Sequence, residues 1–220
     1  MKKLIIIGGG NFGREVFTWA NQCVEFGKDW LVAGFLDDRP NILDSFKDHS
    51  CLIGAPHLHI PSKDEIFICA VGSPAEKRKY CDILLQRGAI FANVIHPTAV
   101  FGQHVQIGQG VIVCPRVVVS NEVRLGSFSA INTLCSIGHN VVVGDYCQIN
   151  PCAAIGGHAL LEDGVTLGSN ASMLPHSVAR QGSVIGAGSV VLRQVPAGQT
   201  VFGVPAKVVR FPKTQNNTNE

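Results

Sequence analysis

His139 is the strongest candidate for a catalytic side chain in the C-terminal half of this 220-residue chain. It stands in the segment INTLCSIGHN, residues 131–140, among small, apolar and amide side chains. An imidazole titrates near neutral pH, so a positioned histidine can take a proton from an attacking nucleophile. A surface histidine on a turn would look the same over so short a segment, so the surrounding pattern has to distinguish the two interpretations.

A glycine-rich segment near the N-terminus indicates phosphate chemistry. GGGNFG at residues 8–13 matches the G-x-G-x-x-G pattern between an apolar run and a helical stretch. Backbone N–H groups at such a helix N-terminus bind phosphate, and an acidic pair after the next strand can accept hydrogen bonds from a sugar or base. A dinucleotide and a nucleotide-linked sugar present the same groups. The predicted nucleotide-binding residues are Gly8, Gly10, Asn11, Gly13, Asp37 and Asp38.

The elements that must position this loop alternate between apolar runs and helical stretches. Residues 4–7, 31–36 and 65–71 predict strands, and residues 12–26 and 75–86 predict helices. This order favours a small parallel α/β sheet. About three or four strands are too few for a complete dinucleotide-binding fold. An NAD-dependent enzyme would also need a substrate domain that we do not find.

The elements that must position His139 follow a six-residue period. Large apolar side chains at every sixth position would fill a solenoid of short strands, and small residues four positions later would fit its corners. Glycine often follows the large residue, as at Gly126 and Gly138, and we expect it to supply the dihedrals of a corner. The periodic apolar residues are Ile95, Phe101, Ile107, Val113, Val119, Leu125, Ile131, Ile137, Val143, Ile149, Ile155, Leu161, Leu167, Met173, Ala179, Ile185 and Val191.

This repeat resembles that of the hexapeptide-repeat acyltransferases, whose fold is a left-handed parallel β-helix with three hexapeptides in each coil. The chain also contains IxGxGxxG, FLDD at the end of the second apolar run, VIHPTA before the repeats and FGVPAK after them. With these motifs, nearly the whole chain is similar to the bacterial nucleotide-sugar N-acetyltransferases of the bacillosamine and perosamine pathways, which are grouped with sialic acid O-acetyltransferases.

The resemblance implies a small Rossmann-like parallel α/β sheet followed by a left-handed parallel β-helix. Residues 1–92 would hold the nucleotide sugar, residues 93–212 would form the β-helix that binds acetyl-CoA and catalyses transfer, and residues 213–220 would be a disordered tail. In the family, a homotrimer builds the site between subunits, and trimerisation would also cover exposed sheet surface.

Roles of single residues follow from the resemblance. His139 matches the general base, Asn132 lies near the acceptor in the family motif, and the Gly157 N–H would face the thioester carbonyl. The implied catalytic residues are His139, Asn132 and Asn140. The implied acetyl-CoA-binding residues are Gln148, Gly157, Gly186, Ala187, Gly203, Pro205 and Lys207.

Two positions depart from the family pattern. Many relatives have an acidic residue directly after the histidine, where this chain has Asn140. An amide stabilises an imidazolium less than a carboxylate does, and Glu122 and Asp145 are candidates for a supporting acid by their proximity in sequence. Some relatives also carry a second histidine nine residues after the first, where this chain has Gln148.

The resemblance implies an N-acetyltransferase that acetylates the amino group, expected at C4, of a nucleotide-linked amino-deoxy sugar, expected to be UDP-linked, in surface-glycan biosynthesis. Acetyl-CoA would be the co-substrate, His139 the base of a direct transfer, and no metal would be needed. The first alternative is an O-acetyltransferase acting on sialic acid or another capsule or lipopolysaccharide sugar. The second is a non-catalytic trimeric binding protein.

Composition excludes several other classes. The net charge of +2, with 15% charged residues and no basic run, does not favour a nucleic-acid partner. No apolar run reaches the length of a membrane span, and the first one is too short for a signal peptide, so we expect a cytoplasmic protein. The eight cysteines form no CxxC pair and are expected to be buried, reduced thiols. The γ-class carbonic anhydrases share the β-helix, but the histidine that would complete their zinc site after His139 is missing.

Overall fold

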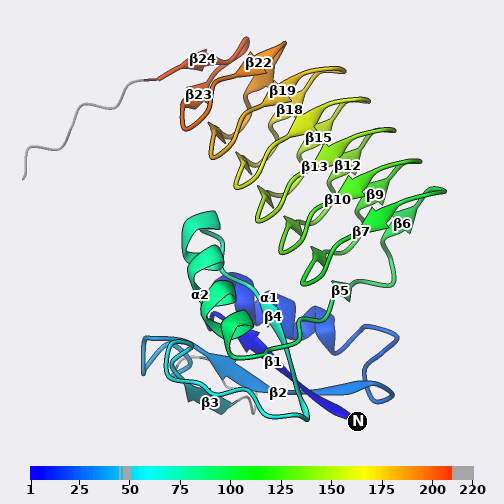
Figure 1. Ribbon diagram of the computed structural model, residues 1–220. Helices are drawn as coiled ribbons and strands as arrows, with labels where there is room; N and C mark the ends of the chain where they lie inside the picture. The colour runs from blue at the N-terminus through cyan, green and yellow to red at the C-terminus, as the bar shows by residue number, and fades with distance from the viewer. Residues whose placement is uncertain (45, 47–50, 210–220) are drawn as a thin grey trace, which may run out of the picture.

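The computed structural model describes residues 1–44, 46 and 51–209. An α/β region lies at one end of the molecule, and a solenoid of short strands extends from it (Figure 1). The predicted tail at residues 213–220 lies outside the described residues. Among the described residues, no helix is both long and apolar enough to cross a lipid bilayer.

The α/β region contains four parallel strands in the order β3-β2-β1-β4. Its central strand β1 is buried along the apolar run predicted from the sequence. The fourth strand, β3, is half-exposed and was not among the predicted runs. The elements are β1 (Lys2–Ile7), α1 (Asn11–Ala20), β2 (Trp30–Leu36), β3 (Cys51–Gly54), β4 (Glu65–Cys69) and α2 (Pro74–Gln86).

The two helices begin and end for local reasons. Ser73 caps α2 by accepting a hydrogen bond from the Glu76 N–H at 3.4 Å, and Pro74 occupies the first helical position, where its missing N–H costs nothing. Helix α1 has no side-chain cap at its N-terminus, which leaves its first N–H groups free for another acceptor. The helix predicted over residues 12–26 is shorter than expected, because α1 ends at Ala20 and turns follow.

The solenoid stacks its strands in three parallel sheets, one for each side of a triangular coil. Each strand pairs with the strand 18 residues later, as Val94 pairs with Ile112, so three hexapeptides make one coil as predicted. The strands are β5 (Val94–Ile95), β6 (Val100–Phe101), β7 (Gln106–Ile107), β8 (Ile112–Val113), β9 (Val118–Val119), β10 (Arg124–Leu125), β11 (Ala130–Ile131), β12 (Ser136–Ile137), β13 (Val142–Val143), β14 (Gln148–Ile149), β15 (Ala154–Ile155), β16 (Leu160–Leu161), β17 (Thr166–Leu167), β18 (Ser172–Met173), β19 (Val178–Ala179), β20 (Val184–Ile185), β21 (Val190–Val191), β22 (Gln194–Val195), β23 (Thr200–Phe202) and the antiparallel β24 (Lys207–Val208).

The periodic apolar residues form the core of the solenoid. Ile131, Ile137 and Val143 are all buried, one on each side of the same coil. The small residues Cys135 and Val141 are buried beside the corners. Because each coil repeats this arrangement, apolar side chains stack on their equivalents in the next coil and form one continuous core.

The corner glycines correct one expectation. The left-handed backbone of each corner lies three residues after the large apolar residue, and it is often not glycine, as at Asn140 (φ 58°) and His158 (φ 59°). The glycines directly after the large residues instead permit close approach between coils. A Cβ on Gly126 would lie 2.4 Å from the carbonyl carbon of Gly144 in the next coil. Those glycines are needed for space rather than for a positive φ.

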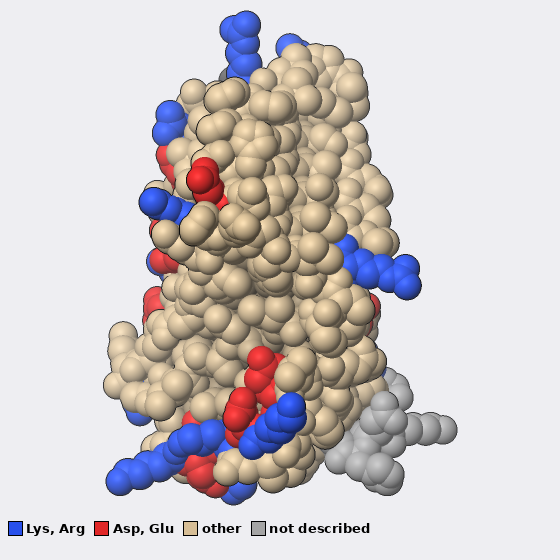
Figure 2. Space-filling view, turned by 90° about the vertical axis from the view of Figure 1, so that its right-hand side faces the viewer, with Lys and Arg blue, Asp and Glu red and all other residues tan. Residues whose placement is uncertain are grey.

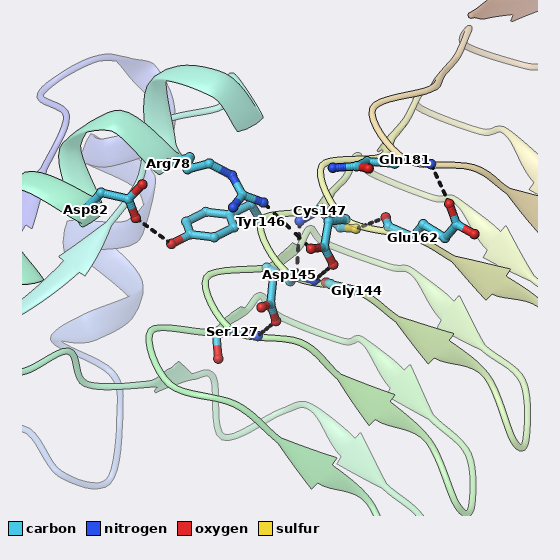
Figure 3. Close-up of polar contacts among 11 residues, drawn as sticks. Arg78, Asp82, Ser127, Gly144, Asp145, Tyr146, Cys147, Glu162 and Gln181 are labelled. Carbon is cyan, nitrogen blue, oxygen red and sulfur yellow. Dashed lines mark hydrogen bonds and ion pairs between the residues drawn. The ribbon is translucent and has the colours of Figure 1, made fainter. Parts of the chain in front are cut away.

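Helix α2 joins the two regions by packing against the solenoid. The Phe128 ring stacks on Tyr146 with centroids 4.9 Å apart, and the Tyr146 hydroxyl donates a hydrogen bond to Asp82 at 3.1 Å. The Arg78 guanidinium lies over the same tyrosine ring, 4.2 Å from its centroid (Figure 3). A second tie is His96, which opens the first coil and lies 2.8 Å from the Gln22 side-chain oxygen. Both regions therefore share one packed body.

The cysteines agree with the interpretation as unreactive thiols at most positions. All eight are free, six are buried, and Cys51 and Cys152 are exposed. Burial raises the pKa of Cys135 to about 11 and that of Cys147 to about 12. These thiols stay protonated near neutral pH and are poor nucleophiles.

Candidate active site

A pocket of about 410 Å³ lies at the carboxyl ends of the α/β strands, where the glycine loop meets α1. The structure brings together there five of the six residues predicted to bind a nucleotide: Gly8, Gly10, Asn11, Asp37 and Asp38. The sixth has another role. A Cβ on Gly13 would lie 1.8 Å from the Gly8 carbonyl oxygen, so this glycine lets α1 pack directly against the loop.

Asp37 links the glycine loop to Arg39 at the pocket. Its carboxylate accepts hydrogen bonds from the Gly9 N–H at 2.8 Å and from two guanidinium nitrogens of Arg39, each at 2.8 Å. Burial alone would raise the pKa of Asp37, but the bonds from Arg39 and Gly9 outweigh it and hold this pKa below its ordinary value. The carboxylate is thus engaged by the chain itself and acts as a brace for the glycine loop.

Arg39 and Tyr80 line this pocket, and the sequence reasoning missed both. The Tyr80 hydroxyl donates a hydrogen bond to Asp38 at 2.6 Å, which is the main reason that the pKa of Asp38 is lowered and that of Tyr80 is raised to about 12. A Cβ on Gly10 would lie 3.6 Å from the Arg39 guanidinium, so this cation stands over the glycine loop. The pocket offers helix N–H groups and an arginine to an anion, and a carboxylate to a sugar or base.

His139 lies at the solenoid corner between β12 and β13 and is exposed. Its Nδ1 is 2.9 Å from the Asn140 side-chain oxygen, and the Asn140 amide nitrogen donates a hydrogen bond to the Glu122 carboxylate. Of the two candidate acids, Glu122 therefore reaches this corner. The Asp145 carboxylate lies at another corner and accepts the Ser127 N–H at 2.7 Å (Figure 3).

Two further histidines extend from His139 along the solenoid. The His158 ring meets the His139 ring edge-on, with centroids 5.0 Å apart, and stacks face to face on His176 at 4.9 Å. The sequence reasoning gave His176 no role. The signal was present in the spacing, because residues 18 positions apart occupy the same place in successive coils. The rings support one another by these contacts. Within residues 1–44, 46 and 51–209, no three or more His, Cys, Asp or Glu side chains are arranged to hold a metal ion.

Gly157 lies directly beneath the His139 ring. A Cβ at this position would lie 2.7 Å from the imidazole Nε2 and 2.8 Å from Cε1. Glycine is therefore the residue that lets the ring rest against the backbone of the next coil. This placement puts the Gly157 backbone beside Nε2, the ring nitrogen that faces away from Asn140.

Asn132 and Gln148 are placed away from His139. Asn132 is buried at a different corner of the same coil, where its side-chain oxygen accepts the Thr133 N–H at 2.7 Å. Gln148 is only 3% exposed and accepts a hydrogen bond from the buried Lys77 ammonium at 3.2 Å. It lies buried at the contact between α2 and the solenoid.

The remaining predicted acetyl-CoA residues gather at the far end of the solenoid. A Cβ on Gly186 would lie 2.1 Å from the Phe202 ring, so that ring packs on the glycine. Gly203 has a φ of 104° and its N–H is bonded to Ser189. Pro205 and Lys207 line a shallow pocket of about 360 Å³ at the last coil. Ala187, the residue after Gly186, is exposed.

The chain has counterparts among known proteins. Residues 3–84 match the family model of the PglD N-terminal domain. Over 121 residues, the chain is 30% identical to GDP-perosamine N-acetyltransferase of Escherichia coli O157:H7, and this match spans about half of each protein, 52% of either length.

Solved structures extend the likeness to nearly the whole chain. The acetyltransferase domain of PglB from Neisseria gonorrhoeae FA1090 has a TM-score of 0.85 at 26% identity and covers 95% of this chain and 100% of its own. It has also been solved in complex with acetyl coenzyme A. A mutant perosamine N-acetyltransferase from Caulobacter crescentus, in complex with CoA and GDP-perosamine, has the same TM-score at 24% identity, covering 96% and 98% of the two chains, and so shares the fold.

The architecture described above agrees with that of these relatives along nearly the whole chain. A four-stranded parallel sheet precedes a three-sided parallel solenoid, as in the structures that match along the chain. The predicted fold class is therefore confirmed. Residues 3–84 match the PglD N-terminal domain, and the solenoid has the fold of the left-handed β-helix in the sugar N-acetyltransferases that the chain is similar to. The resemblance indicated by the sequence is therefore confirmed.

Proposed function

We propose that this protein is an acetyl-CoA-dependent N-acetyltransferase that acetylates the amino group of a nucleotide-linked amino-deoxy sugar. The observation that carries the proposal is His139, whose Nδ1 is held by Asn140 while its other ring nitrogen lies against Gly157. The amino group acetylated would be at C4, and the product would serve surface-glycan biosynthesis in the cytoplasm.

The pocket of the α/β region is the proposed site for the nucleotide. Its α1 N-terminus and Arg39 suit the diphosphate, and Asp38 suits a hydroxyl or N–H of the sugar or base. We expect a UDP-linked sugar. The Escherichia coli relative is named for GDP-perosamine, which makes a GDP-linked sugar the main competitor.

Acetyl-CoA is the proposed co-substrate, as in the PglB domain that has been solved with it. Its pantetheine arm would run along the corner of Gly186 and Ala187, and its nucleotide end would lie near Gly203, Pro205 and Lys207. This path is consistent with the fold, because these residues lie in the coils that follow the His139 coil, toward the end of the solenoid away from the α/β region.

The proposed mechanism is direct transfer. The Nε2 of His139 removes a proton from the sugar amine while the amine nitrogen forms a bond to the thioester carbonyl carbon. The resulting oxyanion is stabilised by the Gly157 N–H. Collapse of this intermediate breaks the carbon–sulfur bond, and the proton held by His139 passes to the departing CoA thiolate. Holding both substrates at one corner supplies much of the remaining rate.

We propose a homotrimer as the working assembly. The sheet of β6, β9, β12, β15, β18 and β21 presents outward residues without charge, among them the exposed Val100 and Val118. Figure 2 shows the corresponding side of the molecule, where charged side chains gather toward the edges and the α/β end. His139 and Asn132 border opposite edges of this face, on either side of β12. A neighbouring copy that covers the face would approach both.

A thiol-release assay tests the function. Acetyl-CoA is combined with a panel of UDP-, dTDP- and GDP-linked 4-amino sugars, with free sialic acid as a hydroxyl acceptor. We expect turnover with a nucleotide-linked amine, and a loss of about 100- to 10,000-fold in His139→Ala with acetyl-CoA binding retained. His104→Ala is the matched control, since His104 is another exposed corner histidine.

Each other outcome of the assay is informative. Turnover with sialic acid alone would replace the amine by a hydroxyl acceptor. Absence of turnover with every acceptor, despite acetyl-CoA binding, would favour the non-catalytic binding protein. Full activity in His139→Ala would remove His139 from the mechanism. Light scattering checks the trimer, and a monomer at working concentration would contradict it.

A further inference from the structure

We propose that Asn140 and Glu122 are positioning residues that hold His139 in a single tautomer, with the proton on Nδ1 and the basic lone pair on Nε2. The proposal rests on the function proposed above, in which His139 is the base. The three side chains form one chain of contacts, from the Glu122 carboxylate through the Asn140 amide to the His139 ring.

The orientation of the Asn140 amide follows from the chemistry of its partner. An ionised carboxylate only accepts hydrogen bonds, so Asn140 has to present its NH₂ group to Glu122. The amide oxygen then faces the imidazole at 2.9 Å, and an oxygen there can only accept. The ring nitrogen that it meets, Nδ1, must therefore carry the hydrogen. This leaves Nε2 unprotonated in the neutral ring.

The solenoid sets the spacing of this chain of contacts from Glu122 through Asn140 to His139, which we call the relay. Glu122 and Asn140 stand 18 residues apart, at the same corner position of successive coils, and their φ angles are 60° and 58°. The backbone is fixed there by hydrogen bonds between coils, such as Asn140 N–H to the Asn121 carbonyl at 3.0 Å. Asparagine tolerates a left-handed backbone better than most residues do. Its short side chain therefore suits both the turn and the bridge.

The relay accounts for the absence of an acid beside His139. A carboxylate in direct contact would fix the tautomer and also stabilise the imidazolium by its full charge. An amide between the two fixes the tautomer equally well, while the charge of Glu122 acts from one residue farther away. The arrangement orients the base more than it strengthens it.

The sharpest test replaces Glu122 by two residues of similar length. In Glu122→Gln, the new amide oxygen can still accept from the Asn140 NH₂, so the relay is retained without its charge. In Glu122→Lys, the ammonium can only donate. Asn140 then turns its oxygen toward Lys and its NH₂ toward the ring, which forces Nδ1 to accept and moves the hydrogen to Nε2. His104→Lys is the control for added charge, because it places a lysine at the equivalent corner one coil earlier.

The readout independent of catalysis is the ¹⁵N NMR spectrum of His139, assigned by comparison with His139→Asn. We expect Nδ1–H in the native protein, in Glu122→Gln and in His104→Lys, and Nε2–H in Glu122→Lys. We also expect kcat to fall by about 10- to 100-fold in Glu122→Lys, in line with other outer partners of functional histidines. KM and the thermal midpoint should stay close to those of the native protein, since Glu122 and His139 are exposed.

Failure of this proposal and failure of the proposed function give different results. An Nε2–H tautomer in the native protein, or an unchanged tautomer in Glu122→Lys, overturns the relay even if His139→Ala is inactive. The expected tautomers together with full activity in His139→Ala would keep the relay and remove the base. A fall in kcat in His104→Lys equal to that in Glu122→Lys would assign the effect to charge and also overturn the relay.

Discussion

The nucleotide pocket and the His139 corner are built in opposite ways. The pocket is assembled from distant segments: Asp37 braces the glycine loop, while Asp38 meets Tyr80 from α2 and His57 from the loop after β3. The corner is assembled from one repeated element, since Glu122, Asn140 and His158 occupy the same place in successive coils. In the solenoid, the residues that neighbour one another at a corner can be identified in the sequence from a fixed spacing of 18 residues. In the α/β pocket no such spacing relates the neighbouring residues.

The two regions also differ in how tightly their key glycines are confined. Beneath Gly13 lies backbone, which cannot move without displacing α1, whereas beside Gly157 lies the His139 ring, which can swing into solvent. A methyl group should therefore damage the fold in one region and the chemistry in the other.

Gly13→Ala is expected to have the largest effect. Its Cβ would sit 1.8 Å from the Gly8 carbonyl oxygen, so the loop and α1 must separate, at a cost of about 3 kcal/mol of unfolding free energy. Urea unfolding measures this loss, and titration calorimetry should show loss of nucleotide-sugar binding with acetyl-CoA binding retained. Gly72→Ala is the control for stability, because its Cβ would meet no atom within 4 Å. Equal effects of both substitutions would contradict the role of Gly13.

Gly157→Ala is expected to reduce activity without weakening the fold. Its Cβ would overlap the His139 ring at 2.7 Å and push the imidazole away from the backbone. We expect kcat to fall by about 10- to 100-fold, the usual result of misplacing a reacting group. Steady-state kinetics and a thermal scan check this. A large drop in the thermal midpoint would show that the two glycines are confined alike.

Asp37→Asn is expected to lower stability by about 1 to 2 kcal/mol, because a buried carboxylate with four N–H donors is replaced by an amide that matches them poorly. The effect depends on pH in a defined direction. Since the folded pKa of Asp37 lies below 3.8, its stabilisation is present above that pH and is lost as pH falls toward the lowered value. Asp64→Asn, which removes an exposed ion pair with Lys3, should change stability little. Equal acid sensitivity in Asp37→Asn and the native protein would contradict the brace.

Lys77→Met is expected to have the smallest effect, at the contact between the two regions. Burial lowers the pKa of Lys77, whose ammonium has Gln148 as a hydrogen-bond partner among Cys69, Cys81 and Cys147. The unfolded chain binds the proton more tightly, so native stability should rise as pH increases from the lowered pKa toward 10.5. The variant should lose that rise and be about as stable at neutral pH. Urea unfolding at neutral and alkaline pH checks both, and a clear loss of stability at neutral pH would show that the charge is needed.

Much of this protein could be predicted from periodic and local signals. The six-residue ladder and the glycine loop with its acidic pair follow from short-range spacing, and the structure has them where they were expected. The roles of the corner glycines and of Gly13 could not be predicted, because a clash with another coil or another turn is not visible along the chain.

The sequence by itself determined the solenoid, because the apolar side chain at every sixth position has to be buried. It also singled out His139 and the glycine loop as candidates for the chemistry. Only the tertiary structure decided their partners. Asn140 links His139 to Glu122 and not to Asp145, Arg39 pairs with Asp37, and Gln148 is buried against Lys77. Those contacts join residues of different coils or of the α/β region and the solenoid, and their geometry is set by how the elements pack.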